Sequence, residues 1–169
     1  EVRDLIRKTV NKYQWIFVGA FPPQLVDLVQ QKKIEFYPWQ PLLKYPYFIN
    51  SLNAQLMVAP LQVNDFNKAK SDIKFIEACV LGIPCLCQDM DTYNSAPESL
   101  RFSSVGEFEQ KIASILNWKN KANYYNSIQG LRAIGQKRIL ELDPNIGSHI
   151  EALSTPFGST DREYLKKWN

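Results

Sequence analysis

Histidine, long apolar runs and blocks of like charge are what this 169-residue sequence has least of. Its single histidine, His149, has no neighbour in the sequence that suggests a catalytic partner. Ser-His-Asp and Cys-His catalysis therefore find no support, and we expect a surface histidine. No apolar run approaches the roughly 18 residues of a membrane-spanning helix. The net charge of +3 comes without a block of lysine and arginine, which gives no case for nucleic-acid binding.

Cysteine is also scarce, and its number is odd. Cys79, Cys85 and Cys87 lie in apolar segments, and the Cys-Leu-Cys pair has no second cluster that would complete a zinc site. We therefore expect buried, reduced thiols in a cytoplasmic protein, with no bound metal and no cofactor. The chain shows no secretory signal, and it opens without methionine.

The remaining composition, 45% hydrophobic and 22% charged residues, is typical of one globular domain. Periodicity and turn residues predict helices over 1–13, 24–31, 48–52, 72–81, 107–117 and 122–142, and strands over 15–20, 34–37, 56–61, 83–88 and 100–103. This alternation indicates an α/β fold: one Rossmann-like parallel sheet flanked by helices, with ligands at the carboxyl ends of the strands. In the last helix we expect Tyr125 to face inward, and Arg132 and Arg138 to lie on a solvated face.

A polar loop over 64–70 and the helix over 72–81 form the chemical centre of the chain. Ser71 is the expected N-cap of this helix, and Gly82 is the left-handed residue that ends it. The helix is apolar nearly all round, which predicts packing on more than one side.

Lys74 and Glu77 interrupt this apolar surface three residues apart, hence on one face. Lys70 and Ser71 stand at the helix N-terminus, where free backbone N–H groups and lysines favour phosphate. The carboxylate further along could accept hydrogen bonds from the vicinal hydroxyls of a ribose, so the order is that of a bound nucleotide. The alternative is an ordinary helix pair worth about 0.2–0.5 kcal/mol, with Ser71 only a cap.

One pattern resembles the donor-binding half of GT-B glycosyltransferases, and most closely the group-1, GT4-like transferases. It consists of Ala59-Pro60-Leu61, Asn64, Phe66-Asn67, Lys70-Ser71, Lys74, Glu77 and Gly82-Ile83-Pro84. The resemblance implies that Lys70, Ser71 and Lys74 bind the diphosphate of a nucleotide-sugar. It implies that Glu77 binds the ribose, without a metal ion.

Other donor contacts follow from the same resemblance. Ala69 stands where that family has a second glutamate near the sugar, so sugar recognition would fall to Asn64 or Asn67. The loop after the strand over 34–37 approaches the base in such proteins, which makes Trp39 a candidate base contact. Tyr93 is a further candidate near the donor. The alternatives are an aromatic loop that packs the domain edge and a tyrosine in a surface loop.

The resemblance also implies a domain organisation. Residues 1–153 would form the nucleotide-sugar-binding Rossmann-like domain, with its first strand missing, and residues 154–169 a tail. An N-terminal acceptor-binding domain of the same parent chain would be the partner, and membrane association would arise only through missing parts. The expected function is the donor-binding domain of a hexosyltransferase-type glycosyltransferase, inactive alone, that moves a sugar to an acceptor hydroxyl.

Two other functions stay open at this stage. A non-catalytic Rossmann-like module could dock another protein through its aromatic loop over 39–48. Lys70, Lys74 and Glu77 would then form a structural ion-pair network. A nucleotide-sugar epimerase is weaker, because His149 alone would have to meet its need for histidine.

Overall fold

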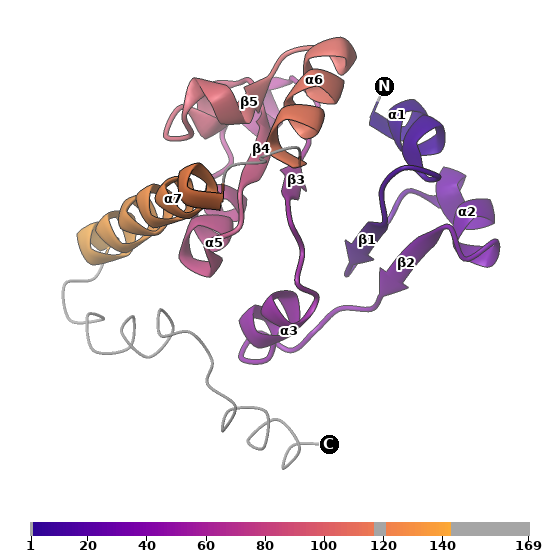
Figure 1. Ribbon diagram of the computed structural model, residues 1–169, viewed down its shortest axis with the longest axis horizontal. Helices are drawn as coiled ribbons and strands as arrows, with labels where there is room; N and C mark the ends of the chain where they lie inside the picture. Colours follow the sequence, from indigo (N-terminus) through magenta and orange to yellow (C-terminus); the bar gives the residue numbers. More distant parts are fainter. Residues whose placement is uncertain (1, 117–120, 143–169) are drawn as a thin grey trace.

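Helices and parallel strands alternate along most of the chain in the computed structural model, which describes residues 2–116 and 121–142 (Figure 1). The α-helices are α1 (Val2–Thr9), α2 (Val26–Gln30), α3 (Tyr45–Ser51), α4 (Asp65–Lys68), α5 (Ile73–Leu81), α6 (Val105–Leu116) and α7 (Lys121–Leu142). The strands are β1 (Trp15–Val18), β2 (Ile34–Tyr37), β3 (Met57–Ala59), β4 (Cys85–Gln88) and β5 (Arg101–Phe102). Short 3-10 turns are η1 (Pro23–Leu25), η2 (Asp91–Tyr93) and η3 (Glu98–Leu100).

The strands form two parallel sheets instead of the single sheet that we expected. One sheet has the order β1-β2 and the other the order β3-β4-β5. Every pairing in them is parallel, with Trp15 opposite Ile34 and Met57 opposite Cys85. The expectation of a mixed α/β fold with parallel strands flanked by helices is confirmed. The sheet is divided because β1 and β3 do not pair with each other.

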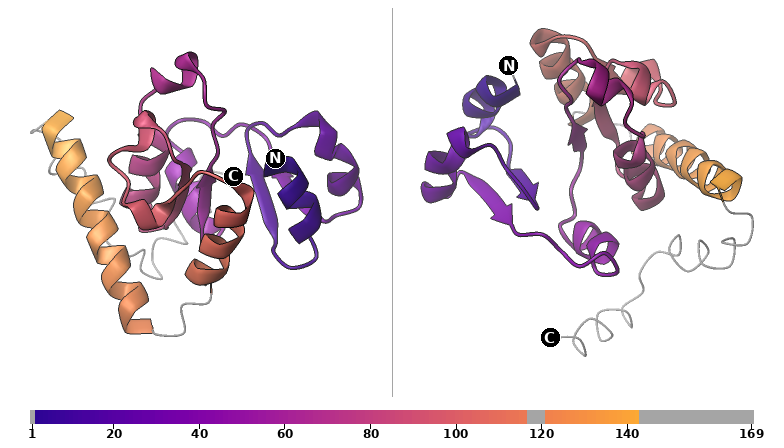
Figure 2. Two further views of the ribbon diagram at one scale, coloured as in Figure 1. Left: turned by 90° about the horizontal axis from the view of Figure 1, so that it is seen from above. Right: turned by 180° about the vertical axis from the view of Figure 1, so that it is seen from behind.

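Two groups of buried side chains hold these layers together. The main core surrounds β4 and α5 and includes Phe75, Leu86 and Phe108, all fully buried. The N-terminal core is smaller and consists of Ile6, Leu25, Leu28 and Ile34. Figure 2 shows α1, β1, α2 and β2 on one side of the molecule and the remaining elements on the other.

The long helix α7 packs along α5. Ile128 and Leu131 are buried in the main core, as the sequence predicted. Tyr125 is exposed, however, so its expected inward position is wrong. The solvated face is also wrong in part, because Arg138 makes an ion pair with Asp72 and the Nε atom of Arg132 is buried.

Local capping explains where several boundaries differ from expectation. The polar stretch over 64–70 is not all loop, because α4 forms in it with the Asn64 side chain accepting a hydrogen bond from the Asn67 N–H at 2.9 Å. α6 begins at Val105, where the Ser104 hydroxyl accepts a hydrogen bond from the Glu107 N–H at 3.2 Å. The tail over 154–169, the end of the expected domain at 153 and His149 lie outside the described residues.

Candidate functional site

Asp72, and not Ser71, occupies the N-cap position of α5. Its carbonyl accepts hydrogen bonds from the N–H groups of Phe75 at 2.9 Å and Ile76 at 3.1 Å. Its carboxylate makes no capping bond and instead accepts hydrogen bonds from Ser95 and, at 3.1 Å, from Arg138 on α7. The predicted cap is wrong because these two partners hold the neighbouring carboxylate at the helix N-terminus.

The N-terminus of α5 therefore already has a negatively charged side chain beside it, the carboxylate of Asp72. The Asp72 side chain is largely buried, and Arg138 balances its charge. Lys70 and Ser71 are exposed just ahead of it. The Lys70 ammonium lies 4.8 Å from the centroid of the Phe66 ring, a cation–π contact at the surface. Lys70 and Ser71 thus lie at the surface, ahead of an ion pair in which Asp72 is buried and Arg138 is partly exposed.

Lys74 and Glu77 lie on one face of α5, as their spacing predicted. The Lys74 ammonium donates a hydrogen bond to Glu77 Oε2 at 2.9 Å and to the Tyr45 hydroxyl at 3.2 Å. The Tyr45 hydroxyl also lies 3.4 Å from Glu77 Oε2, and its ring centroid is 5.0 Å from the ammonium. A three-residue cluster on α3 and α5 thus replaces the simple pair. Sequence reasoning missed Tyr45, although it had singled out the aromatic stretch that contains it.

This cluster keeps Lys74 charged. Burial opposes the charged ammonium, but hydrogen bonds and charge from Glu77 and Tyr45 outweigh it and raise the pKa of Lys74. The hydrogen bonds that Glu77 accepts from Lys74 and Tyr45 both use Oε2, and among the described residues Oε1 has no hydrogen-bond partner. One carboxylate oxygen is therefore held in place while the other can accept a hydrogen bond from a ligand.

Asn67 serves the loop that leads into α5. It is buried, and its amide donates a hydrogen bond to the Gln62 carbonyl at 2.7 Å. The backbone carbonyl of Asn67 accepts a hydrogen bond from the Thr92 hydroxyl at 2.6 Å, which ties α4 to η2. Asn64, its partner in the cap of α4, is exposed. The structure thus gives both asparagines a part in shaping the loop.

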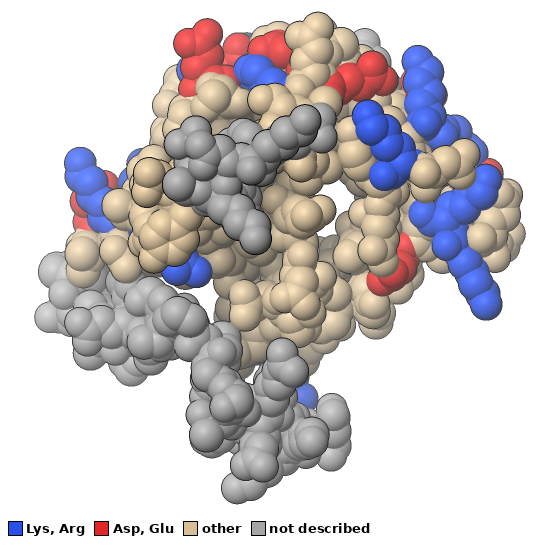
Figure 3. Space-filling view, viewed as in Figure 1, with Lys and Arg blue, Asp and Glu red and all other residues tan. Residues whose placement is uncertain are grey.

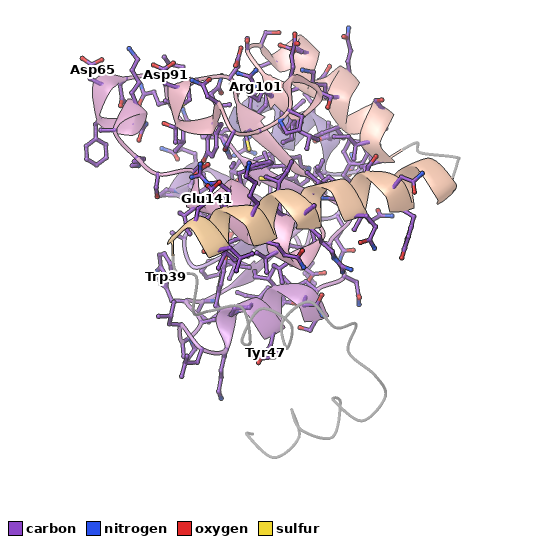
Figure 4. The ribbon with its side chains drawn as sticks, turned by 90° about the vertical axis from the view of Figure 1, so that its left-hand side faces the viewer. Trp39, Tyr47, Asp65, Asp91, Arg101 and Glu141 are labelled. Carbon is purple, nitrogen blue, oxygen red and sulfur yellow. The ribbon has the colours of Figure 1, made fainter. Side chains whose placement is uncertain are left out.

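Trp39 lies at the carboxyl end of β2, over Gly19 at the carboxyl end of β1. Gly19 has a φ of 89°, and a Cβ there would come within 2.9 Å of the indole ring, so only glycine fits under it. Trp39 itself remains 78% exposed. Figure 4 shows Trp39 on the opposite side of α7 from Asp65, which begins α4. Trp39 is thus positioned by the sheet of β1 and β2, apart from the loop before α5.

Tyr93 is only 2% exposed and belongs to the main core. The alternative of a surface-loop tyrosine is therefore wrong. Its burial also raises the pKa of its hydroxyl. Little of this side chain is left for a ligand, whereas Lys70 and Ser71 are exposed just before α5 and Lys74 and Glu77 lie on its first two turns.

The cysteines behave as the sequence predicted. All three are free and buried, and the sulfur atoms of Cys85 and Cys87 lie 3.6 Å apart on the same face of β4. Among the described residues, no group of three His, Cys, Asp or Glu side chains could hold a metal ion. No helix in the described part of the chain is long and apolar enough to cross a lipid bilayer.

Comparison with known proteins identifies no relative. No family model, no curated protein and no solved structure matches the chain.

Proposed function

We propose that this chain is the donor-binding domain of a glycosyltransferase of the GT-B type. Such an enzyme would move a sugar from a nucleoside diphosphate sugar to an acceptor hydroxyl held by another domain. The observation that carries the proposal is the exposure of Lys70 and Ser71 directly before α5, together with the Lys74–Glu77 pair on one face of that helix. That helix follows the loop at the carboxyl end of the parallel strand β3, where α/β folds bind their ligands.

Some of these residues would bind the diphosphate of the donor, and another would bind its ribose. Lys70 and the Ser71 hydroxyl are exposed and would bind the phosphate oxygens together with Lys74. Glu77 would accept a ribose hydroxyl on Oε1 while Lys74 and Tyr45 hold Oε2. Sugar contacts would come from Asn64, because it is the exposed member of the two asparagines.

The proposed chemistry is stabilisation of a leaving group. Negative charge develops on the diphosphate as the glycosidic bond breaks, and fixed ammonium groups act most strongly at that point. The raised pKa of Lys74 keeps it cationic at neutral pH, as this role requires.

The three free thiols favour a reducing compartment such as the cytoplasm.

Calorimetric titration of the chain with UDP, GDP and ADP tests the proposal. We expect saturable binding of one nucleotide and about tenfold weaker binding by Glu77→Gln, because the neutral amide is a poorer acceptor for a hydroxyl. The matched control is Glu109→Gln, which neutralises an exposed carboxylate on α6 and should leave the affinity unchanged. A chain that binds none of the three nucleotides, or binds one equally well after Glu77→Gln, has no donor site at α5.

A second function has its own observation in favour. Leu42 and Leu43 are each 85% exposed, next to the exposed Trp39, so the turn between β2 and α3 presents an apolar surface. A docking module would use this surface to bind another protein, and Lys74 and Glu77 would only join α5 to α3. Such a module binds no nucleotide, so the same titration separates the two functions.

A further inference from the structure

The segment that carries Lys70 and Ser71 lies between two buried anchor points. All four residues of this segment, 68–71, are exposed. Asn67, which precedes it, is only 7% exposed, and the side chain of Asp72, which follows it, is 11% exposed. The ends of the segment are therefore held within the protein, whereas the residues between them lie at the surface.

One short turn, residues 91–95, contacts both anchor points. It consists of η2 and the two residues that follow it. The Thr92 hydroxyl donates a hydrogen bond to the Asn67 backbone carbonyl at 2.6 Å. The Ser95 hydroxyl donates one to the Asp72 carboxylate. A single turn thus holds the exposed segment at both of its ends.

This turn is itself fixed to the main core. Tyr93, which lies between the two hydroxyl-bearing residues, is 2% exposed and packs in that core. Met90 and Ala96, just before and just after the turn, belong to the same core. The two hydroxyl groups are therefore presented by a part of the chain that packing holds in place.

The Asn67 carbonyl also links the turn to Lys70. It accepts a second hydrogen bond, from the Lys70 N–H at 3.2 Å. A carbonyl oxygen has two lone pairs, so it can accept both bonds at once. Thr92 thus orients the group to which the Lys70 backbone is bound, and loss of its hydroxyl would loosen Lys70 as well.

The charges of the molecule make the position of this segment important for an anion. Figure 3 shows lysine and arginine side chains gathered over α1 and α2, which lie on the other side of the molecule from α4 and α5 (Figure 2). Nearer to the segment, Asp65 begins α4 and Asp91 begins η2, at the same edge of the molecule (Figure 4). A phosphate would gain little from this surrounding charge, so its binding would depend on where Lys70 and Ser71 are held.

We propose that Thr92 and Ser95 are positioning residues, which hold Lys70 and Ser71 in place for the diphosphate of the donor. This role rests on the proposed function, because that function supplies the ligand. Neither hydroxyl touches the diphosphate, and both act through the backbone of the segment. A segment that is already ordered pays less conformational entropy when a ligand binds, which strengthens binding.

Three variants and one control test this role. Thr92→Val removes one hydroxyl and keeps the branched shape of the side chain, and Thr92→Ser keeps the hydroxyl. Ser95→Ala removes the other hydroxyl at a half-buried position, and it decides the question if Thr92→Val does not fold. The matched control is Ser104→Ala, which removes a hydroxyl that caps α6 and leaves the segment untouched.

Calorimetric affinities for a nucleotide and for its nucleoside separate positioning from a general loss of stability. For whichever of UDP, GDP and ADP binds, we expect about tenfold weaker binding by Thr92→Val and by Ser95→Ala. Thr92→Ser and Ser104→Ala should bind as the unchanged chain does. The nucleoside has no phosphate, so its affinity should be the same in all variants. Equal losses for nucleotide and nucleoside would overturn the positioning role.

Amide hydrogen exchange at Lys70 provides a readout that needs no ligand. We expect this amide to exchange about tenfold faster in Thr92→Val than in the unchanged chain, and at the original rate in Ser104→Ala. An unchanged rate in Thr92→Val would overturn the role of Thr92, whatever the chain binds. Faster exchange in a chain that binds none of the three nucleotides would instead overturn the proposed function and the ligand that it supplies, but not the contact between turn and segment.

Discussion

Glu77 has to be understood together with the two groups that hold it. Its side chain is 28% exposed and that of Lys74 is 50% exposed, and ion pairs this accessible contribute about 0–1 kcal/mol to folding. The hydroxyl of Tyr45 adds a third partner from a different helix. Because this cluster contributes so little to stability, Glu77→Gln should alter nucleotide binding without unfolding the chain.

The cysteine thiols give a prediction at the scale of single residues. Burial raises the pKa of the Cys79 thiol from 9.0 to about 12, so the folded state keeps it protonated where the unfolded chain ionises it. The unfolded chain therefore binds fewer protons above pH 9.0, and this thiol's contribution to stability is lost as the pH rises from 9.0 toward about 12. We expect the urea midpoint to fall across that range.

Thiol titration provides the matching measurement. Because all three cysteines are buried, a disulfide reagent at pH 8 should label none of them in the folded protein. It should label all three after unfolding in urea. Rapid labelling of the native chain would contradict the buried positions on α5 and β4.

At the scale of elements, the contact of α5 with α7 decides how the proposed site is held. Arg138 of α7 balances Asp72 at the start of α5. One turn earlier, Gly135 lets the two helices approach: a Cβ at this position would lie 3.0 Å from Cys79 Cβ and 3.1 Å from the Val80 backbone nitrogen. The packing of the carboxyl-terminal half of α5 therefore depends on a glycine in a different helix.

Substitution of this glycine tests the close approach. Gly135→Ala should destabilise the protein by about 1–3 kcal/mol, because the added methyl group overpacks the contact with α5. Gly130→Ala is the control in the same helix. Its added Cβ would meet nothing within 4 Å, so we expect stabilisation by about 0.5–1 kcal/mol from helix propensity alone. Urea unfolding measures both changes, and stabilisation by both variants would show that the helices are not in close contact at Gly135.

Across the whole molecule, the sequence predicted the local elements better than their assembly. The strand over 34–37 has the expected bounds, and Gly82 ends α5 with a φ of 68°, because these features depend on neighbouring residues. The cap at Asp72 and the partnership of Tyr45 with Lys74 depend on residues from distant segments. The division into two sheets depends on a strand pairing that no local pattern encodes. Long-range contacts of this kind are what periodicity and turn residues do not reveal.

The two cores predict two units that lose structure separately. Leu25 in the N-terminal core and Leu86 in the main core are both fully buried, so replacing either with alanine removes a similar packing contribution of about 2–5 kcal/mol. Because β1 and β2 pair with no strand of the other sheet, we expect Leu25→Ala to accelerate amide exchange in α1 and β2. All three thiols belong to the main core and should stay unreactive in this variant.

Leu86→Ala should instead make the thiols reactive toward the disulfide reagent, because Leu86 lies between Cys85 and Cys87 on β4. Equal thiol reactivity in the two variants would mean that the molecule unfolds as one unit despite its divided sheet. A difference would show that β1 and β2 are held to the rest of the molecule mainly by side chains such as Val2 and Trp15, which pack against the main core.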